Sequence, residues 1–88
     1  MTLQKAIDTL NQKFPGCDAA PMVEFNGRET DGIWFRNSEG YSLSDGPMID
    51  TYYWEDTFGT HPKVEAALKS LGYFSEAYDS GTLMAYKI

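Results

Sequence analysis

Two segments with the apolar spacing of helices, set among short strand-like segments that end in turn residues, constrain the fold of this chain most strongly. The first, residues 2–14, begins with Thr2 as the expected N-cap and stops at Pro15 and Gly16. Its apolar side chains recur on one helical stripe: Leu3, Ala6, Ile7, Leu10 and Phe14. This spacing predicts an amphipathic helix with one buried face.

The second helical segment, residues 61–71, has the clearest boundaries. Thr60 is the expected N-cap, Pro62 occupies the first turn, and Gly72 marks the end. Four apolar residues form its buried stripe: Val64, Ala67, Leu68 and Leu71. The residues expected in the core come from both helices and one strand: Leu10, Phe14, Phe35, Val64, Leu68 and Leu71.

Three or four strands are expected between the helices. Residues 22–28 alternate in the manner of a strand, and a turn is expected within residues 26–32. Both Asn26-Gly27 and Asp31-Gly32 have the composition of that turn, so the register of this hairpin stays open.

The next hairpin is better defined, because a three-residue loop ending in Gly40 separates residues 33–37 from residues 41–44. In its expected register Phe35 lies opposite Leu43. Trp34 then falls on the polar face, where it is predicted to be exposed.

Two further strand regions complete the chain. Residues 48–55 are predicted to form a strand, since they are rich in aromatic and β-branched residues. Residues 73–78 and 82–88 are predicted to form a hairpin with Tyr78 paired to Thr82. One face of that hairpin carries smaller side chains (Ser75, Ala77, Leu83, Ala85) and the other larger ones (Phe74, Tyr78, Met84, Tyr86, Ile88). The pattern leaves open which face is buried.

These elements predict an α+β fold, a small two-layer domain with an antiparallel sheet of about five strands and two helices, in the order α-β-β-β-β-α-β-β. With 88 residues, a second independent core would not fit, so residues 1–88 are expected to form a single globular domain. At 42% hydrophobic residues, the chain is too apolar to stay disordered.

Several function classes lack the residues they need. A structural zinc site takes about four Cys or His ligands, and this chain offers only Cys17 and His61. A thiol–imidazole pair of these two residues is less favoured than separate structural roles, and no phosphate-binding glycine motif is present. We therefore expect no enzymatic activity, no catalytic residue, no metal and no cofactor. The absence of a long apolar run or a signal-like N-terminus favours a cytoplasmic protein without membrane contact.

The charge of the chain is concentrated in its middle third. Residues 29–62 contain seven acidic residues and one base, Arg36, which accounts for the whole net charge of −6. The same range holds seven of the thirteen aromatic residues. Nucleic acid and anionic membranes would be repelled by this charge, so we expect no direct nucleic-acid binding. A solvated strand face would account for part of the pattern.

In the strand expected at residues 48–55, alternation turns Ile49 and Tyr53 inward. It sends Asp50, Tyr52 and Trp54 outward. A partner-binding face is therefore predicted from six residues: Trp34, Asp50, Tyr52, Trp54, Glu55 and Asp56. Its expected partner is a basic protein surface, for instance that of a nuclease or another nucleic-acid-binding protein. The chain would then be a small acidic inhibitor of the immunity or phage anti-defence kind (anti-CRISPR or anti-restriction). The alternatives are a structural or adaptor protein that self-associates through its aromatic strand face as a homo-oligomer, and, less favoured, a small enzyme.

Overall fold

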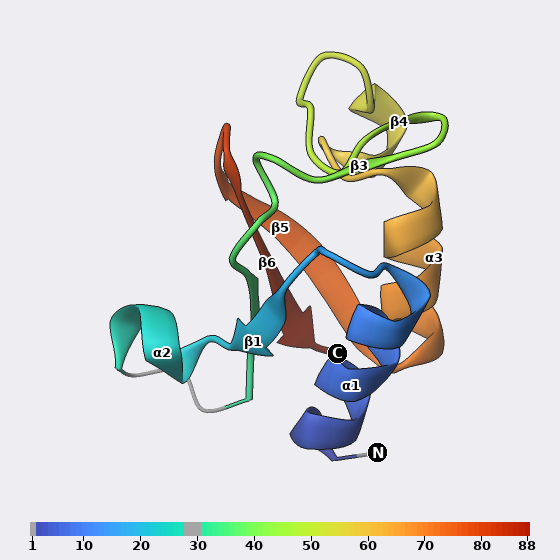
Figure 1. Cartoon of the computed structure of the whole chain (residues 1–88). Helices are drawn as coiled ribbons and strands as arrows, with labels where there is room; N and C mark the ends of the chain where they lie inside the picture. Colours follow the sequence, from blue (N-terminus) through green and yellow to red (C-terminus); the bar gives the residue numbers. More distant parts are fainter. Residues whose placement is uncertain (1, 28–30) are drawn as a thin grey trace.

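Four antiparallel strands form the main sheet of the computed structural model, which describes residues 2–27 and 31–88 (Figure 1). Their order across the sheet is β1 (Ala19–Pro21), β2 (Ile33–Phe35), β6 (Thr82–Lys87) and β5 (Tyr73–Asp79). A second, two-stranded sheet joins β3 (Ser42–Leu43) to β4 (Gly46–Pro47). The α+β class expected from the sequence is confirmed.

Both predicted helices are present, as α1 (Leu3–Lys13) and α3 (Pro62–Ser70). The hydroxyl of Thr2 caps α1 as predicted, accepting a hydrogen bond from the Lys5 amide at 3.2 Å. The predicted cap of α3 is wrong by one residue. His61 takes this role, its Nδ1 accepting from the Lys63 amide at 3.0 Å. The Thr60 hydroxyl instead lies 2.8 Å from that of Ser75, and it is buried.

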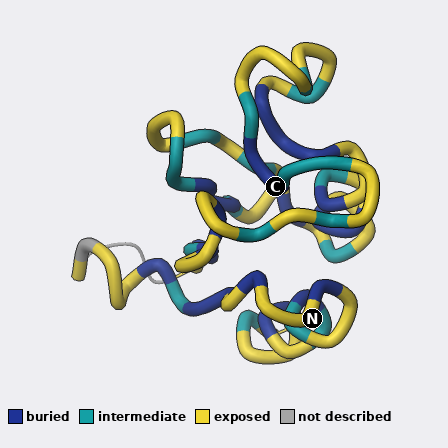
Figure 2. Tube along the Cα trace, turned by 45° about the horizontal axis from the view of Figure 1, so that its top comes forward, coloured by how far each residue is buried: buried dark blue, intermediate teal, exposed yellow. Residues whose placement is uncertain are grey.

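One hydrophobic core lies between the helices and one face of the sheet, and Figure 2 shows the buried stretches toward the middle of the molecule. Five of the six predicted core residues are buried (Leu10, Phe14, Phe35, Val64, Leu68), and Leu71 is half-buried against them. The face of the C-terminal hairpin with the smaller side chains packs inward, since Leu83 and Ala85 are fully buried in this cluster. Small side chains on this face let the helices approach closely. Met84, on the face with the larger side chains, is buried as well.

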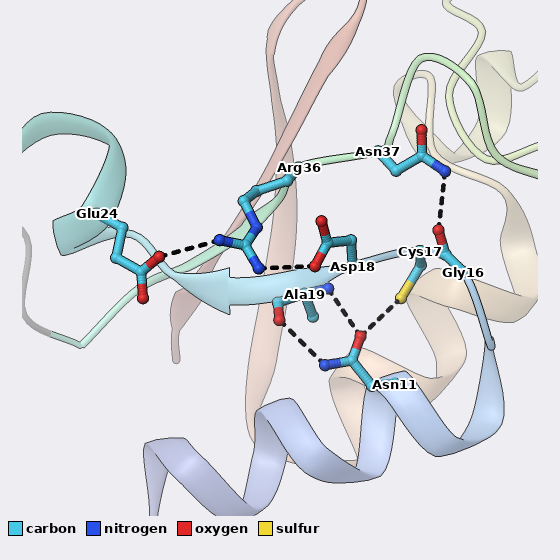
Figure 3. Close-up of polar contacts among 8 residues, drawn as sticks. All are labelled: Asn11, Gly16, Cys17, Asp18, Ala19, Glu24, Arg36 and Asn37. Atoms are coloured by element: carbon cyan, nitrogen blue, oxygen red, sulfur yellow. Dashed lines mark hydrogen bonds and ion pairs between the residues drawn. The ribbon is translucent and has the colours of Figure 1, made fainter.

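The predicted strand at residues 22–28 is wrong. The strand comes earlier, as β1, and the described part of residues 22–28 contains the short helix α2 (Val23–Asn26). The side chain of Asn11 fixes β1 in place, because it bonds both the amide and the carbonyl of Ala19, at 2.8 and 3.0 Å (Figure 3). The turn expected within residues 26–32 falls partly outside the described residues.

The predicted pairing of residues 33–37 with 41–44 is also wrong. Phe35 lies opposite Ala19 on one side and Leu83 on the other, instead of opposite Leu43. A buried serine secures the connection that follows, because the Ser38 hydroxyl donates to the Gly81 carbonyl and accepts from the Leu83 amide. Long-range pairing makes β2 a central strand, and burying its residues outweighs the local hairpin.

Residues 48–55 do not form the predicted strand. Ile49 makes only an isolated bridge to Thr60. The Asp50 carboxylate then accepts hydrogen bonds from the amides of Tyr52 and Tyr53, at 3.0 and 2.9 Å, and so turns the chain. The 3₁₀ helix η1 (Glu55–Thr57) follows.

The C-terminal hairpin is present as β5 and β6, but Asp79 rather than Tyr78 pairs with Thr82, with an irregularity between Ala77 and Asp79. The predicted face assignment of Ser75 and Ala77 nevertheless holds, since they lie opposite Ala85 and Leu83. The extra residue is absorbed beside the turn, so the rest of the hairpin keeps its alternation.

Candidate partner-binding site

Residues 50–58 form a loop that projects from the end of the molecule near β3 and β4, drawn in yellow at the top of Figure 1. We call this segment the aromatic loop. Tyr52 is 88% exposed, Tyr53 64% and Phe58 89%. Most of the surface of these three rings stays in water, so packing in the core of this chain does not explain why the loop is aromatic.

Trp54 anchors the aromatic loop to the rest of the fold. Its indole N–H donates to the Pro47 carbonyl at 2.8 Å, and its ring centroid lies 4.6 Å from that of His61. The Trp54 backbone also closes the loop, with its amide bonded to the Asp50 carbonyl and its carbonyl accepting from the Gly59 amide. The backbone that carries the exposed rings is therefore held in place by the contacts of Trp54.

His61, which is buried, packs against Trp54 and is itself held by hydrogen bonds. The Nδ1 of His61 accepts a backbone hydrogen bond, so the ring proton sits on Nε2, which donates to the Asp45 carboxylate at 2.7 Å. Lys63 approaches the other oxygen of Asp45 at 3.5 Å. The hydrogen bond from His61 lowers the pKa of the Asp45 carboxyl. Asp45 thus helps to position His61, and through it Trp54 and the aromatic loop.

The structure brings together five of the six predicted site residues: Asp50, Tyr52, Trp54, Glu55 and Asp56. The predicted orientations within this group are partly wrong, because Tyr53 points outward and Trp54 is half-buried. Side chains alternate between two faces only in a strand, whereas this segment is a turn followed by a 3₁₀ helix.

Trp34 belongs to a different surface and is half-buried rather than exposed. Its ring packs on Phe25 of α2 at 5.0 Å between centroids, and Phe25 contacts Tyr78 at 5.3 Å. In Figure 1, α2 lies well away from the aromatic loop. These three rings form what we call the sheet-face cluster, separate from the loop.

Sequence reasoning missed Tyr53 and Phe58 as exposed residues of the site. Strand alternation assigns Tyr52 and Tyr53 to opposite faces, so it could not place both rings outward. Phe58 also adopts a left-handed backbone conformation, with φ of 54°, and Gly59 follows it. Such a conformation is uncommon for an aromatic residue, and no spacing rule indicates it.

Two hollows flank the aromatic loop. The first is about 320 Å³ and is lined by Tyr52, Tyr53, Trp54, Glu55, Asp56, Thr57 and Pro62. The second is about 280 Å³ and is lined by Asp56, Thr57, Phe58, Glu65, Lys69, Phe74 and Ser75. We call them hollow A and hollow B. Each combines aromatic walls with at least two carboxylates, which is a composition suited to a cationic group.

The carboxylates of Glu55 and Asp56 are available to such a group. Both residues are exposed, and across residues 2–27 and 31–88 no ion pair involves either of them. Other acidic residues are already engaged, since Asp18 and Glu24 both pair with Arg36, at 2.8 and 3.1 Å (Figure 3). Charge that can attract a partner is thus concentrated beside the exposed rings.

Cys17 and His61 have separate partners. The Cys17 thiol is buried and lies 3.5 Å from the Asn11 side-chain oxygen, as Figure 3 shows, whereas His61 bonds to Asp45. Burial raises the pKa of the Cys17 thiol. In the described part of the chain no group of three or more potential metal ligands is found, and no helix there is long and apolar enough to cross a membrane.

Another hollow, of about 410 Å³, lies between α1 and α3, where Lys13 and Lys63 border a floor that includes Phe14. Lys63 already approaches Asp45, which offsets part of the positive charge of this hollow.

Comparison with known proteins finds no matching family, no similar curated protein and no similar solved structure.

Proposed function

We propose that this chain is a non-enzymatic binding protein whose aromatic loop docks on a basic surface of a partner protein. The observation that carries the proposal is a combination on one anchored loop. Tyr52, Tyr53 and Phe58 are exposed there beside Glu55 and Asp56, which form no ion pair within residues 2–27 and 31–88. Rings at the centre of an interface slow dissociation, and surrounding charges speed association.

A partner that binds nucleic acid fits this surface best. Such proteins carry clusters of Lys and Arg that neutralise phosphates, and carboxylates can occupy the same positions. A chain with net charge −6 that covers a phosphate-binding groove would act as a competitive inhibitor, as immunity and phage anti-defence proteins do.

The sheet-face cluster supports a second candidate function, a structural or adaptor role by self-association. Phe25 and Tyr78 are 39% and 60% exposed, and they lie with Trp34 away from the aromatic loop. An apolar surface of this kind associates with little dependence on salt, whereas an acidic loop binds less well as ionic strength rises. The two functions therefore differ in a measurable way.

The test begins with affinity capture of a partner from extracts of the source cells, followed by binding measurements with the purified pair. Tyr52→Ala should weaken binding by about 2–4 kcal/mol, mainly through faster dissociation. Glu55→Gln combined with Asp56→Asn should slow association and flatten the salt dependence. Asp8→Asn, an exposed site on α1, tests the effect of a charge change outside the loop.

Two results would contradict the proposal. One is a partner that binds Tyr52→Ala as tightly as the unchanged chain. The other is loss of binding only with Phe25→Ala, a change in the sheet-face cluster, which would favour the adaptor role. Circular dichroism must show each variant folded before its affinity is compared.

A further inference from the structure

The two hollows beside the aromatic loop share a wall. Asp56 and Thr57 line both of them, so the short helix η1 forms a ridge with hollow A on one side and hollow B on the other. We infer that the loop receives two cationic side chains from one continuous segment of the partner, one in each hollow, with the segment crossing η1. This inference rests on the proposed function and specifies the chemistry of the partner.

Hollow A has the stronger attraction for a cation. Tyr52 and Tyr53 both line it, and the Tyr53 ring lies edge-on to the Trp54 ring, with 4.4 Å between their centroids. Glu55 and Asp56 supply two carboxylates, and none of the Lys and Arg residues that the structure describes lines this hollow. A guanidinium group can stack on a ring while it bonds a carboxylate, which makes arginine the better fit than lysine.

Hollow B has aromatic walls as well, from Phe58 and Phe74, and carboxylates from Asp56 and Glu65. It differs from hollow A because Lys69 lies in its lining. That ammonium group repels an incoming cation, so hollow B should bind more weakly and contribute mainly when hollow A is already filled.

One segment with two cations gains from the fixed geometry of the ridge. Once the first side chain is bound, the second is held close to its hollow at a high effective concentration, provided that the spacing in the segment matches the spacing of the hollows. Affinity should therefore show a maximum at one separation of the two cations, whereas simple attraction by charge would depend on their number alone.

The test uses peptides of glycine and serine that carry either one arginine or two arginines at a series of separations, titrated into isotope-labelled full-length chain and followed by NMR. The two-arginine peptide with the best separation should bind about 10²-fold more tightly than the one-arginine peptide. Both should shift the signals of Tyr52 and Tyr53, and only the two-arginine peptide should shift Phe58 and Phe74 strongly.

Three variants assign the hollows. Phe58→Asn removes the ring from hollow B while keeping a residue that tolerates the left-handed backbone, and it should reduce the two-arginine peptide to the affinity of the one-arginine peptide. Lys69→Gln should tighten only the two-arginine peptide. Tyr52→Ala should weaken both. Asp8→Asn serves as the control for lost charge, and its exposed position lies on α1.

The outcomes separate this inference from the function on which it rests. If the affinity does not depend on separation and Phe58→Asn changes nothing, the two-hollow arrangement is wrong, while a loss with Tyr52→Ala would still support binding of a cation at the loop. If neither peptide shifts the signals of the aromatic loop, both the inference and the proposed basic partner are wrong.

Discussion

The indole ring of Trp54 lies on the imidazole ring of His61, with 4.6 Å between their centroids and an angle of 55° between their planes. His61 is also the N-cap of α3, so a single buried side chain joins the helix to the aromatic loop. The exposed rings of the loop depend on this contact, because the backbone of Trp54 closes the loop through its bonds to Asp50 and Gly59. Substitutions that disturb the contact between Trp54 and His61 should therefore lower both the stability of the fold and the affinity of the loop for a partner.

Gly46→Ala should test that coupling. A Cβ atom at residue 46 would lie 2.6 Å from Cζ2 of Trp54, and φ of +149° is unfavourable for a side chain. We expect a loss of about 1–3 kcal/mol in the free energy of unfolding, because the indole has to move. Gly72→Ala is the matched control, with a positive φ but nothing within 4 Å of the added atom. Equal losses in urea unfolding for the two variants would argue against a tightly packed Trp54.

Leu68→Ala should show how much of the stability depends on α3. Leu68 is fully buried between the helix and the sheet, so its removal leaves a cavity that costs about 2–5 kcal/mol. Leu71→Ala should cost less, since Leu71 is half-buried. Chemical denaturation measures both. A loss below about 1 kcal/mol for Leu68→Ala would mean that α3 does not pack as described.

The contact between Asp45 and His61 should appear in the acid limb of the stability curve. The hydrogen bond from His61 lowers the pKa of the Asp45 carboxyl below its ordinary value of 3.8 in the folded chain. The unfolded chain then takes up the proton first as pH falls. The stabilisation is therefore complete above the ordinary value and is lost as pH drops through the lowered pKa.

Asp45→Asn should accordingly flatten the dependence of unfolding free energy on pH below about 4, where the carboxyl of the unfolded chain titrates. Urea unfolding at a series of acid pH values measures this slope. Asp8→Asn is the comparison, since the Asp8 carboxylate accepts a hydrogen bond from the Gln4 side-chain amide on an exposed helix face. Parallel curves for the unchanged chain and Asp45→Asn would rule out the contribution.

Cys17 should react slowly in the folded protein. Burial raises the pKa of its thiol, so less thiolate is present at a given pH, and the sulfur is fully covered as well. We expect alkylation by iodoacetamide near pH 8 to be at least about tenfold slower than in denaturant. Similar rates in the two conditions would show that the connection between α1 and β1 opens readily.

The two tryptophans should report on different surfaces. Binding of a basic partner at the aromatic loop should alter the emission of Trp54, which borders hollow A, and leave Trp34 in the sheet-face cluster unaffected. Trp34→Phe should keep the change in fluorescence on binding, and Trp54→Phe should remove it. The reverse pattern would place the partner on the sheet face.

Local spacing predicted the helices well because each is specified by residues close together. The Thr2 cap and the stripe through Leu10 define α1, and Pro62 with the stripe through Leu68 defines α3. The same is true of the C-terminal hairpin, whose turn follows Asp79. The fold class follows from these elements, and the apolar faces of the two helices were enough to predict the helical part of the core.

The middle of the chain was predicted less well, because its backbone partners are distant in sequence. β2 pairs with β1 and β6 instead of the neighbouring residues 41–44. The aromatic loop was mistaken for a strand, since aromatic and β-branched residues favour strands when nothing else intervenes. In this chain the turn at Asp50 and the contact of Trp54 with His61 hold the segment in a loop instead.

The sequence by itself determined the two helices, the last hairpin, the α+β class and the concentration of acid and aromatic residues in one region. Tertiary structure alone decided which of those residues share a surface. Burying the indole of Trp54 against His61 turns Tyr52, Tyr53 and Phe58 outward together, while pairing β2 in the centre of the sheet carries Trp34 away from them. The physical reason is that packing and long-range backbone pairing bury more surface than local alternation can, so they override it.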